Sequence, residues 1–301
     1  MKVLVTGATG LVGRELTQLL RDNNIAVHYL TTREEAIENE ADYKGFLWNP
    51  KEHKIDEKCL EGVDAIFHLA GASISKPWTD ENKRAIISSR VDTTRLLYET
   101  LRRNKNGVNQ FICASAIGAY PSSMTQEYTE EFPTYNEGFL GEVVKVWESA
   151  ANELKELQLT VAKVRTGIVL SEKGGALPQI TLPIKLYLGA PLGSGQQWQS
   201  WIHLEDMAQI YLHIYKNWLS GIFNAAAPHP VTNAELTKDA AKALRKPLLL
   251  PAVPQKVLKI AMGDRASIVL ESQKVNSNKI QETGYVFKFP QLTPALQDLL
   301  A

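Results

Sequence analysis

Short apolar runs alternate with segments of helical periodicity along the first half of the chain. The run from Lys2 to Thr6 has the length and composition of a buried strand. Apolar residues then recur at a spacing that places them on one face of a helix, at Val12, Leu16, Leu19 and Leu20. This alternation is typical of βαβ units, in which helices cover a parallel sheet.

The same alternation continues to about residue 170. Further strands are expected over residues 26–30, 65–69, 111–114 and 161–165. Helices are expected around residues 94–101 and over 139–157, where apolar residues again repeat on one stripe. We therefore predict an α/β fold built on a doubly wound parallel sheet of about six strands.

A glycine-rich turn follows the first expected strand and opens the first helix. Gly7 allows a tight turn, Gly10 lets the backbone approach a pyrophosphate, and Gly13 lets helix and strand pack closely. The helix N-terminus then offers free N–H groups to the anion. This position predicts a Rossmann dinucleotide-binding turn, with an ordinary glycine-containing βα turn as the alternative. The expected contacts come from Gly7, Thr9, Gly10, Leu11, Val12 and Gly13.

The second strand ends without the carboxylate that would bind the ribose 2′-hydroxyl of NAD. It runs instead into Thr31, Thr32 and Arg33. A guanidinium pairs well with a 2′-phosphate, and a threonine hydroxyl adds a hydrogen bond. These residues predict NADP (NADPH) as the cofactor. A solvent-exposed arginine at a helix start is the alternative.

Glycine and proline punctuate the sequence beyond Leu170, which indicates loops and short elements. Two further helices are expected over residues 234–244 and 255–262. We assign residues 1–170 to the Rossmann domain, with residues of about 197–228 returning to it. Residues 171–301 are assigned to a smaller mixed α/β lobe that binds the substrate.

The composition narrows the choice of partner. Thirty-three Lys and Arg balance thirty-three Asp and Glu, so no overall positive field attracts nucleic acid or a membrane surface. Cys59 and Cys113 stand apart with no Cys/His cluster, which favours a reducing compartment and no metal site. No uncharged apolar run reaches about 18 residues. We expect a cytoplasmic protein with a small-molecule substrate.

Further motifs accompany the glycine turn. They are His68-Leu69-Ala70-Gly71, the segment 88–94, the segment 114–120, Trp147-Glu148, the segment 165–170, the segment 174–177, the segment 191–195 and the segment 201–206. Together they resemble the extended short-chain dehydrogenases/reductases, and more narrowly the sugar-nucleotide-epimerase-like "epimerase family" proteins. The resemblance spans almost the whole chain, and the tail from about Val253 resembles the small C-terminal domain of this group.

The resemblance implies further cofactor contacts. Leu69, Ala70 and Gly71 would follow the ribose and adenine, and the segment holding Arg165, Gly167 and Ile168 would line the nicotinamide end. The resemblance also leaves open whether the protein forms a homodimer.

Arg90 stands where relatives outside this group often have an asparagine. A guanidinium there either helps to hold the phosphates or pairs with a helix carboxylate.

The superfamily's catalytic Tyr-x-x-x-Lys pair is missing. In active members the lysine lowers the pKa of the phenol, which exchanges a proton during hydride transfer. Lys145 has Gly141 four residues before it, and the register set by Glu148 gives Val144 and Leu140. Neither register supplies a phenol.

Two hydroxyls remain as catalytic candidates. Ser115 matches the family serine, which also contacts the cofactor, although a hydroxyl that caps a strand end is the alternative. Tyr120 is the best acid/base candidate because its loop is expected at the mouth of the same cleft. A packing aromatic explains Tyr120 equally well, and Tyr135 is a weaker rival.

A second departure concerns the substrate. Nucleotide-sugar enzymes of the superfamily commonly carry an arginine for the substrate diphosphate where this chain has Gln199, which has no charge. This argues against a nucleoside-diphosphate sugar. His203 and Asp206, in the same segment, are expected to be packing partners.

Two functions remain. The first is an NADP-dependent oxidoreductase or epimerase/dehydratase-like enzyme acting on a small polar substrate, a sugar derivative among the options. The second is an NADP-binding redox sensor or scaffold with little catalysis, which the missing Tyr-Lys pair favours.

Overall fold

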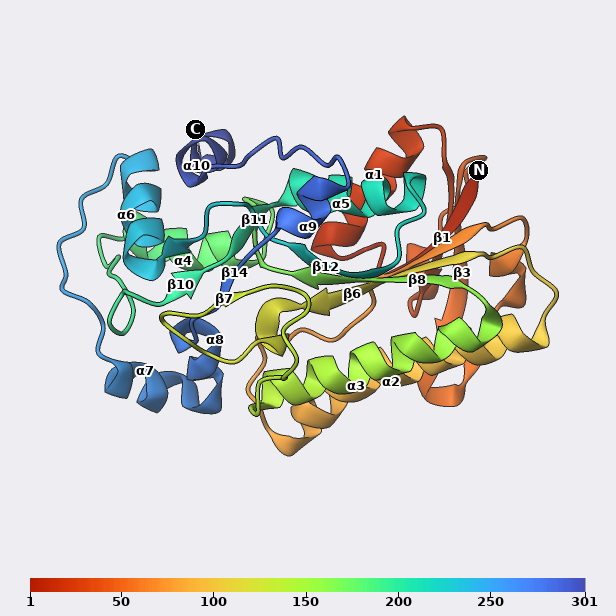
Figure 1. The fold of residues 1–301 in the computed structure, drawn as a ribbon, viewed down its shortest axis with the longest axis horizontal. Helices are drawn as coiled ribbons and strands as arrows, with labels where there is room; N and C mark the ends of the chain where they lie inside the picture. The colour runs from red at the N-terminus through yellow and green to blue at the C-terminus, as the bar shows by residue number, and fades with distance from the viewer. Residues whose placement is uncertain (301) are drawn as a thin grey trace.

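The computed structural model describes residues 1–300, which form a central eight-stranded sheet covered by helices on both faces (Figure 1). The strand order is β12-β8-β6-β5-β1-β2-β3-β4, and only β4 runs antiparallel to its neighbour. The strands are β1 (Lys2–Thr6), β2 (Ala26–Thr31), β3 (Tyr43–Asn49), β4 (Lys54–Ile55), β5 (Ala65–His68), β6 (Gln110–Ala116), β8 (Thr160–Thr166) and β12 (Gly221–Ala225). The order reverses between β1 and β5, which makes this the topological switch point where α/β proteins bind ligands.

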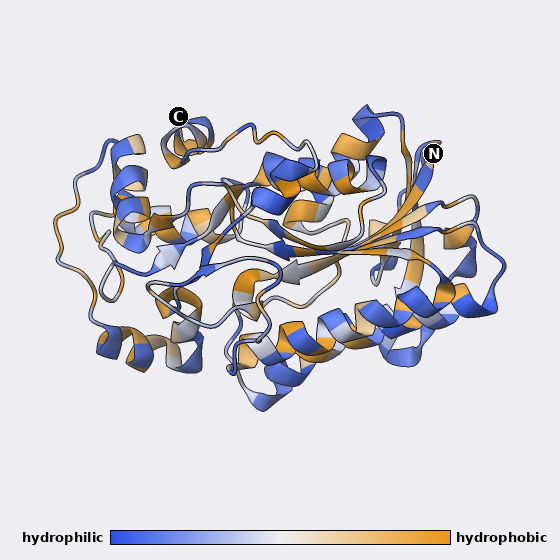
Figure 2. Ribbon diagram, viewed as in Figure 1, coloured by the Kyte–Doolittle hydropathy of each residue, from blue (hydrophilic) through white to orange (hydrophobic). Residues whose placement is uncertain are grey.

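Four long helices form the layers on the two faces of the sheet. On one face α1 (Leu11–Asp22) packs against α5 (Leu204–Lys216), and on the other α2 (Asp80–Arg103) packs against α3 (Phe139–Glu153). Alternate residues of a strand serve the two layers, so Val5 belongs to the α1/α5 core and Leu4 to the α2/α3 core. Figure 2 shows hydrophilic residues on the outer faces of α2 and α3.

The predicted α/β doubly wound fold is confirmed, and so are its expected strands and helices. The expected number of strands was too low, because β3 and β4 extend the sheet at one end and β12 extends it at the other. β3 carries Gly45 in its middle, where a Cβ would lie 2.6 Å from the Tyr29 ring. A strand interrupted by glycine lacks the continuous apolar run that the prediction required.

The C-terminal side of the chain forms a smaller region of short elements. Its helices are α4 (Ala176–Lys185), α6 (Asn233–Ala243), α7 (Gln255–Met262), α8 (Ser267–Leu270), α9 (Asn278–Glu282) and α10 (Leu292–Leu300). Short strands pair β9 (Ile168–Leu170) with β11 (Trp201–His203), β10 (Trp198–Gln199) with β13 (Val231–Thr232), and β7 (Glu127–Tyr128) with β14 (Lys274–Val275). A separate apolar core lies among α4, α6 and α10 (Figure 1).

Short 3₁₀ helices complete the structure. They are η1 (Glu34–Ala36), η2 (Pro50–Glu52), η3 (Glu57–Leu60), η4 (Ile117–Ala119), η5 (Leu154–Leu157) and η6 (Gly263–Ala266). Among residues 1–300 no helix has the length and apolarity to cross a bilayer, and no three His, Cys, Asp or Glu side chains are grouped to hold a metal ion.

Candidate functional site

The glycine turn between β1 and α1 has room for hydrogen atoms only. Gly7 has a φ of +71°, and a Cβ there would lie 2.8 Å from the Leu69 carbonyl. A Cβ on Gly13 would lie 2.1 Å from the Gly7 oxygen. The steric reasons given for Gly7 and Gly13 therefore hold. α1 begins directly after Gly10 and, like any helix, leaves its first N–H groups without intrahelical partners.

A buried histidine, His68 at the end of β5, links that strand to the end of β1 beside the glycine turn. The sequence did not predict this contact. His68 Nδ1 lies 2.8 Å from the Thr6 hydroxyl, which also accepts hydrogen bonds from the Leu69 and Ala70 N–H groups. Burial lowers the pKa of His68 to about 3, so the imidazole is neutral. Its other nitrogen contacts the hydroxyls of Thr93 and Thr94 on α2. This network fixes the backbone of Leu69 and Ala70 beside the turn.

A cleft of about 1060 Å³ opens at the carboxyl ends of β1, β2, β3 and β5. Seven of the predicted cofactor contacts line it, namely Gly7, Thr9, Thr31, Thr32, Arg33, Ala70 and Gly71. Residues that the sequence analysis missed also line it, among them Asn49, Pro50 and Lys51 after β3 and Ser88, Ser89 and Asp92 on α2. The β3 residues escaped because β3 itself was not predicted.

Arg33 sits at the rim of this cleft. Its side chain is exposed, and its guanidinium makes no hydrogen bond to any of residues 1–300. Its backbone N–H donates to the Thr31 hydroxyl, which holds the turn after β2 in place. An unpaired cation beside two threonine hydroxyls is suited to a phosphate group.

Arg90 on α2 is mostly buried and has no carboxylate partner within the described chain. Its Nη1 donates to the carbonyl oxygens of Ala72 and Ile86, its guanidinium lies 4.9 Å from the Trp147 ring centre, and its Nε has no partner. Burial lowers the pKa of Arg90 to about 10. A Cβ on Gly71 would lie 3.0 Å from Cζ, so this guanidinium borders the cleft wall. The helix carboxylate that was the alternative partner for Arg90 is not found.

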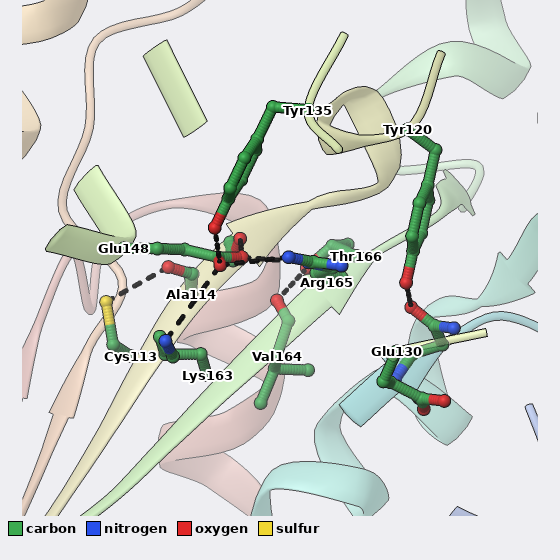
Figure 3. Close-up of polar contacts among 12 residues, drawn as sticks. Cys113, Ala114, Tyr120, Glu130, Tyr135, Glu148, Lys163, Val164, Arg165 and Thr166 are labelled. Atoms are coloured by element: carbon green, nitrogen blue, oxygen red, sulfur yellow. Dashed lines mark hydrogen bonds and ion pairs between the residues drawn. The ribbon is translucent and has the colours of Figure 1, made fainter. Parts of the chain in front are cut away.

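Ser115 and Arg165 belong to a buried network centred on Glu148. Figure 3 shows Arg165 and Tyr135 pointing toward that carboxylate. Ser115 Oγ donates to Glu148 Oε1 at 2.6 Å, and Arg165 donates to both carboxylate oxygens at 2.9 and 3.0 Å. Tyr135 donates to Oε2 at 2.8 Å. Burial alone would raise the pKa of Glu148, but the hydrogen bonds and charge of Arg165 outweigh it, and the pKa is lowered overall. The hydroxyl proton of Ser115 is therefore committed to a carboxylate.

Tyr120 is fully buried, and Figure 3 shows its side chain apart from the cluster around Glu148. The hydroxyl donates to Asn224 Oδ1 at 2.7 Å, and the ring stacks on Tyr128 at 5.0 Å and beneath the Arg165 guanidinium at 4.8 Å. Burial raises the pKa of Tyr120 to about 12. These contacts favour the packing alternative stated for Tyr120 over its acid/base role. Neither Ser115 nor Tyr120 lines the cleft.

The family places its tyrosine and lysine in the first turns of α3. In neither register does this chain have an ionisable side chain there that faces inward. Leu140 Cβ lies 3.4 Å from where a Cβ on Gly118 would stand, and a Cβ on Gly141 would lie 1.9 Å from the Asn136 oxygen. Val144 is buried, whereas Lys145 is exposed to solvent. No phenol fits at Gly141 without moving the chain.

Gly167 and Ile168 join the sheet to the C-terminal region. The Gly167 N–H donates to the Ala225 oxygen and the Ile168 N–H to the Ser200 oxygen. A Cβ on Gly167 would lie 2.4 Å from that Ser200 oxygen, so glycine is required by close packing.

The segment after Gln199 makes packing contacts. Gln199 is buried and brings no charge. Asp206 accepts hydrogen bonds from the Tyr285 hydroxyl and from the N–H groups of Lys288 and Phe289. His203 Nδ1 accepts from the Glu205 N–H at the start of α5.

The doubly wound sheet with a glycine-rich turn at its switch point defines a Rossmann-type, dinucleotide-binding class of protein. Residues 3–226 match the NAD dependent epimerase/dehydratase family, and the chain belongs to that family. Residues 253–299 match a domain of unknown function, DUF1731. The resemblance drawn from the sequence motifs is thereby confirmed.

Similar proteins span the whole chain. "Epimerase family protein SAR0825" of Staphylococcus aureus is 36% identical over 300 residues, which are 99% of this chain and 98% of that protein. The crystal structure of human epimerase family protein SDR39U1 with NADPH has a TM-score of 0.87 and 32% identity, covering 100% of this chain and 99% of the human one. A nucleoside-diphosphate sugar epimerase of Corynebacterium glutamicum has a TM-score of 0.78 and 30% identity, covering 100% of this chain and 58% of that one.

Proposed function

We propose that this protein is an NADP-dependent oxidoreductase or epimerase/dehydratase-like enzyme that acts on a small polar substrate. The observation that carries the proposal is the cleft at the switch point, which the glycine turn and the Arg33 rim border together. The first N–H groups of α1 bind the pyrophosphate, and Thr31, Thr32 and Arg33 bind the 2′-phosphate. A nicotinamide cofactor bound there supplies or accepts a hydride.

Arg90 is the second cation for the cofactor in this proposal. A buried guanidinium without a carboxylate carries a desolvation cost that a bound anion offsets. Its place against Gly71, on the wall of the cleft, directs it toward the phosphates or the adjoining ribose. Ser115, Arg165, Gly167 and Ile168 enclose the nicotinamide end, and Glu148 fixes the side chains of the first two.

The relative with NADPH supports this choice of cofactor. Human SDR39U1, at 32% identity over the full chain, is described with NADPH. In the present chain no Asp or Glu stands among residues 31–33 at the end of β2, where NAD-specific proteins accept bonds from the 2′-hydroxyl.

The substrate of the proposed enzyme lies between the carboxyl ends of the strands and the C-terminal region. Gln199 supplies no charge for a diphosphate, so we infer a smaller polar compound rather than a nucleoside-diphosphate sugar. The buried amide of Gln199 donates only to its own neighbour, the Trp198 oxygen, at 3.3 Å.

Calorimetric titration of NADPH and NADH tests the cofactor assignment. Arg33→Ala should weaken NADPH binding by about 1–3 kcal/mol and NADH binding much less, because only NADPH carries the 2′-phosphate. Arg102→Ala, an exposed arginine at the far end of α2, should leave both affinities unchanged. Equal losses for both cofactors in the Arg33 variant would refute the 2′-phosphate contact.

A second candidate function is an NADP-dependent sensor or scaffold. Leu140 and Val144 at the family's catalytic positions, together with the committed hydroxyls of Ser115 and Tyr120, favour it. An assay of NADPH oxidation with a panel of aldehydes, ketones and sugars, monitored as loss of nicotinamide absorbance, separates the enzyme from the sensor. Tight NADPH binding with no turnover across the panel would support the sensor.

A further inference from the structure

The first turn of α3 lacks the tyrosine of the family, but a carboxyl group reaches it from the C-terminal region. Glu271, directly after α8, places its Oε1 atom 3.9 Å from where a Cβ on Gly138 would stand. Gly138 is the residue before α3, and Leu140 and Gly141 follow two and three residues later. Glu271 is thus the acidic side chain that the structure brings to this helix start from elsewhere in the chain.

The Glu271 carboxyl group is held firmly on one side only. Its Oε2 accepts hydrogen bonds from Asn136 Nδ2 at 3.1 Å and Gln273 Nε2 at 3.0 Å. The two amides are themselves anchored, because the Gly138 N–H donates to Asn136 Oδ1 and Gln273 also donates to the Tyr120 oxygen. Oε1 accepts no hydrogen bond from residues 1–300, and it is the oxygen that faces the start of α3.

The surroundings of Glu271 keep a proton on it more readily than on an ordinary glutamate. Burial raises its pKa, and this outweighs the opposite effect of the amides of Gln273 and Asn136. Charged side chains on the neighbouring elements are engaged elsewhere: Lys83 pairs with Asp264 at 3.3 Å, and Arg265 donates to the Ser75 oxygen. Glu148, by contrast, pairs with Arg165 and stays ionised.

The other proton carriers near this turn are occupied. Ser115 and Tyr135 both donate to Glu148, and Tyr120 donates to Asn224. Burial, and then Glu148, raise the pKa of Tyr135 to about 12, so its phenol exchanges protons poorly at neutral pH.

We propose that Glu271 exchanges a proton with the reacting oxygen of the substrate, in place of the missing tyrosine. This inference rests on the proposed function and narrows its substrate to a carbonyl compound or the corresponding alcohol. In the reducing direction the O–H bond of Glu271 breaks and an O–H bond forms on the substrate oxygen. That oxygen keeps the electron pair of its C=O bond as the carbon takes a hydride from the reduced nicotinamide cofactor. Glu271 is left as a carboxylate and regains its proton from water.

Carbon-13 NMR of protein labelled at the glutamate carboxyl groups tests this without any turnover. Wild-type protein should show a resonance that titrates above the ordinary glutamate range, that is lost in Glu271→Gln and that shifts when NADPH is added. Glu130 is a matched control because burial also raises its pKa, while it binds the Asn224 N–H away from α3. Its resonance, identified with Glu130→Gln, should not respond to NADPH.

Kinetics give the second readout. For any carbonyl compound that the wild type reduces, Glu271→Gln should lower kcat by about 100-fold or more while leaving NADPH affinity unchanged. Glu271→Asp should restore part of the rate, and Glu130→Gln should leave it unchanged. If the wild type binds NADPH but Glu271 titrates in the ordinary glutamate range, or its resonance does not respond to NADPH, the inference is overturned and the proposed function stands. Failure of the wild type to bind NADPH overturns the proposed function, and the assignment of Glu271 with it.

Discussion

Gly13 sets how closely α1 can approach the turn that follows β1. A Cβ there would lie 2.1 Å from the Gly7 oxygen, and neither atom belongs to a flexible side chain. Gly13→Ala should therefore lower the free energy of unfolding by about 1–3 kcal/mol, the usual range for overpacking. It should also weaken NADPH binding, because the N–H groups at the start of α1 move. Chemical denaturation and calorimetric titration measure the two effects.

Gly107 supplies the control for that substitution. A Cβ there would meet the Val63 oxygen at 3.5 Å, an ordinary contact. Gly107→Ala should change the stability by no more than about 0.5 kcal/mol. Equal effects of the two substitutions would show that close packing at Gly13 is unimportant.

Local residues of the site could be predicted from the sequence, whereas distant ones could not. The three glycines and Arg33 lie within one βα turn or at one strand end, so their spacing predicts their positions. Glu271 accepts a hydrogen bond from Asn136, just before α3, although the two residues are 135 positions apart in the sequence. No hydrophobic periodicity in the sequence predicts that contact, because it depends on how the C-terminal region packs on the sheet.

Glu148 connects α3 to two strands of the sheet, β6 through Ser115 and β8 through Arg165. Glu148→Gln should lower the free energy of unfolding at neutral pH by about 3–5 kcal/mol, because it leaves Arg165 buried without its counter-charge. Glu153→Gln near the end of the same helix should change it by about 0.5 kcal/mol at most. Denaturant titration of the two variants tests this coupling.

The same carboxylate predicts a dependence of stability on pH. The pKa of Glu148 is lowered in the folded protein, so its contribution is fully present above the unfolded value of 4.5. As the pH falls below that value toward the folded pKa, the wild type should lose its advantage over Glu148→Gln. An advantage that stays constant between pH 7 and pH 3 would contradict the ion pair.

At the scale of elements, the regular βα cycles were predictable and the ends of the sheet were not. β1, β5, β6 and β8 are almost entirely buried, whereas β3 has exposed positions and Gly45. β12 is a short strand in the second half of the chain that pairs with β8, and its Gly221 start reads as a loop. Pairing with neighbouring strands, rather than the local sequence, makes β3 and β12 part of the sheet.

The whole molecule is held together by contacts between the C-terminal region and the sheet's helices. Asp206 on α5 accepts three hydrogen bonds from Tyr285, Lys288 and Phe289. Asp206→Asn should lower the midpoint of thermal unfolding by several degrees, because an amide cannot accept all three equally well. Asp22→Asn, on the exposed end of α1, should leave the midpoint unchanged. Scanning calorimetry should show one transition for the wild type, and an early, separate transition would contradict this coupling.

The pairing of β7 with β14 has a consequence for how the protein is made. The Ser122 hydroxyl and the Ser123 oxygen bind Ser272, a residue about 150 positions later. The loop around Ser122 therefore meets these partners only after about 150 further residues have left the ribosome. Every residue that lines the cleft lies between Gly7 and Thr93, so the cleft can form early in translation, whereas the contacts of Glu271 with Asn136 wait for the C-terminal region.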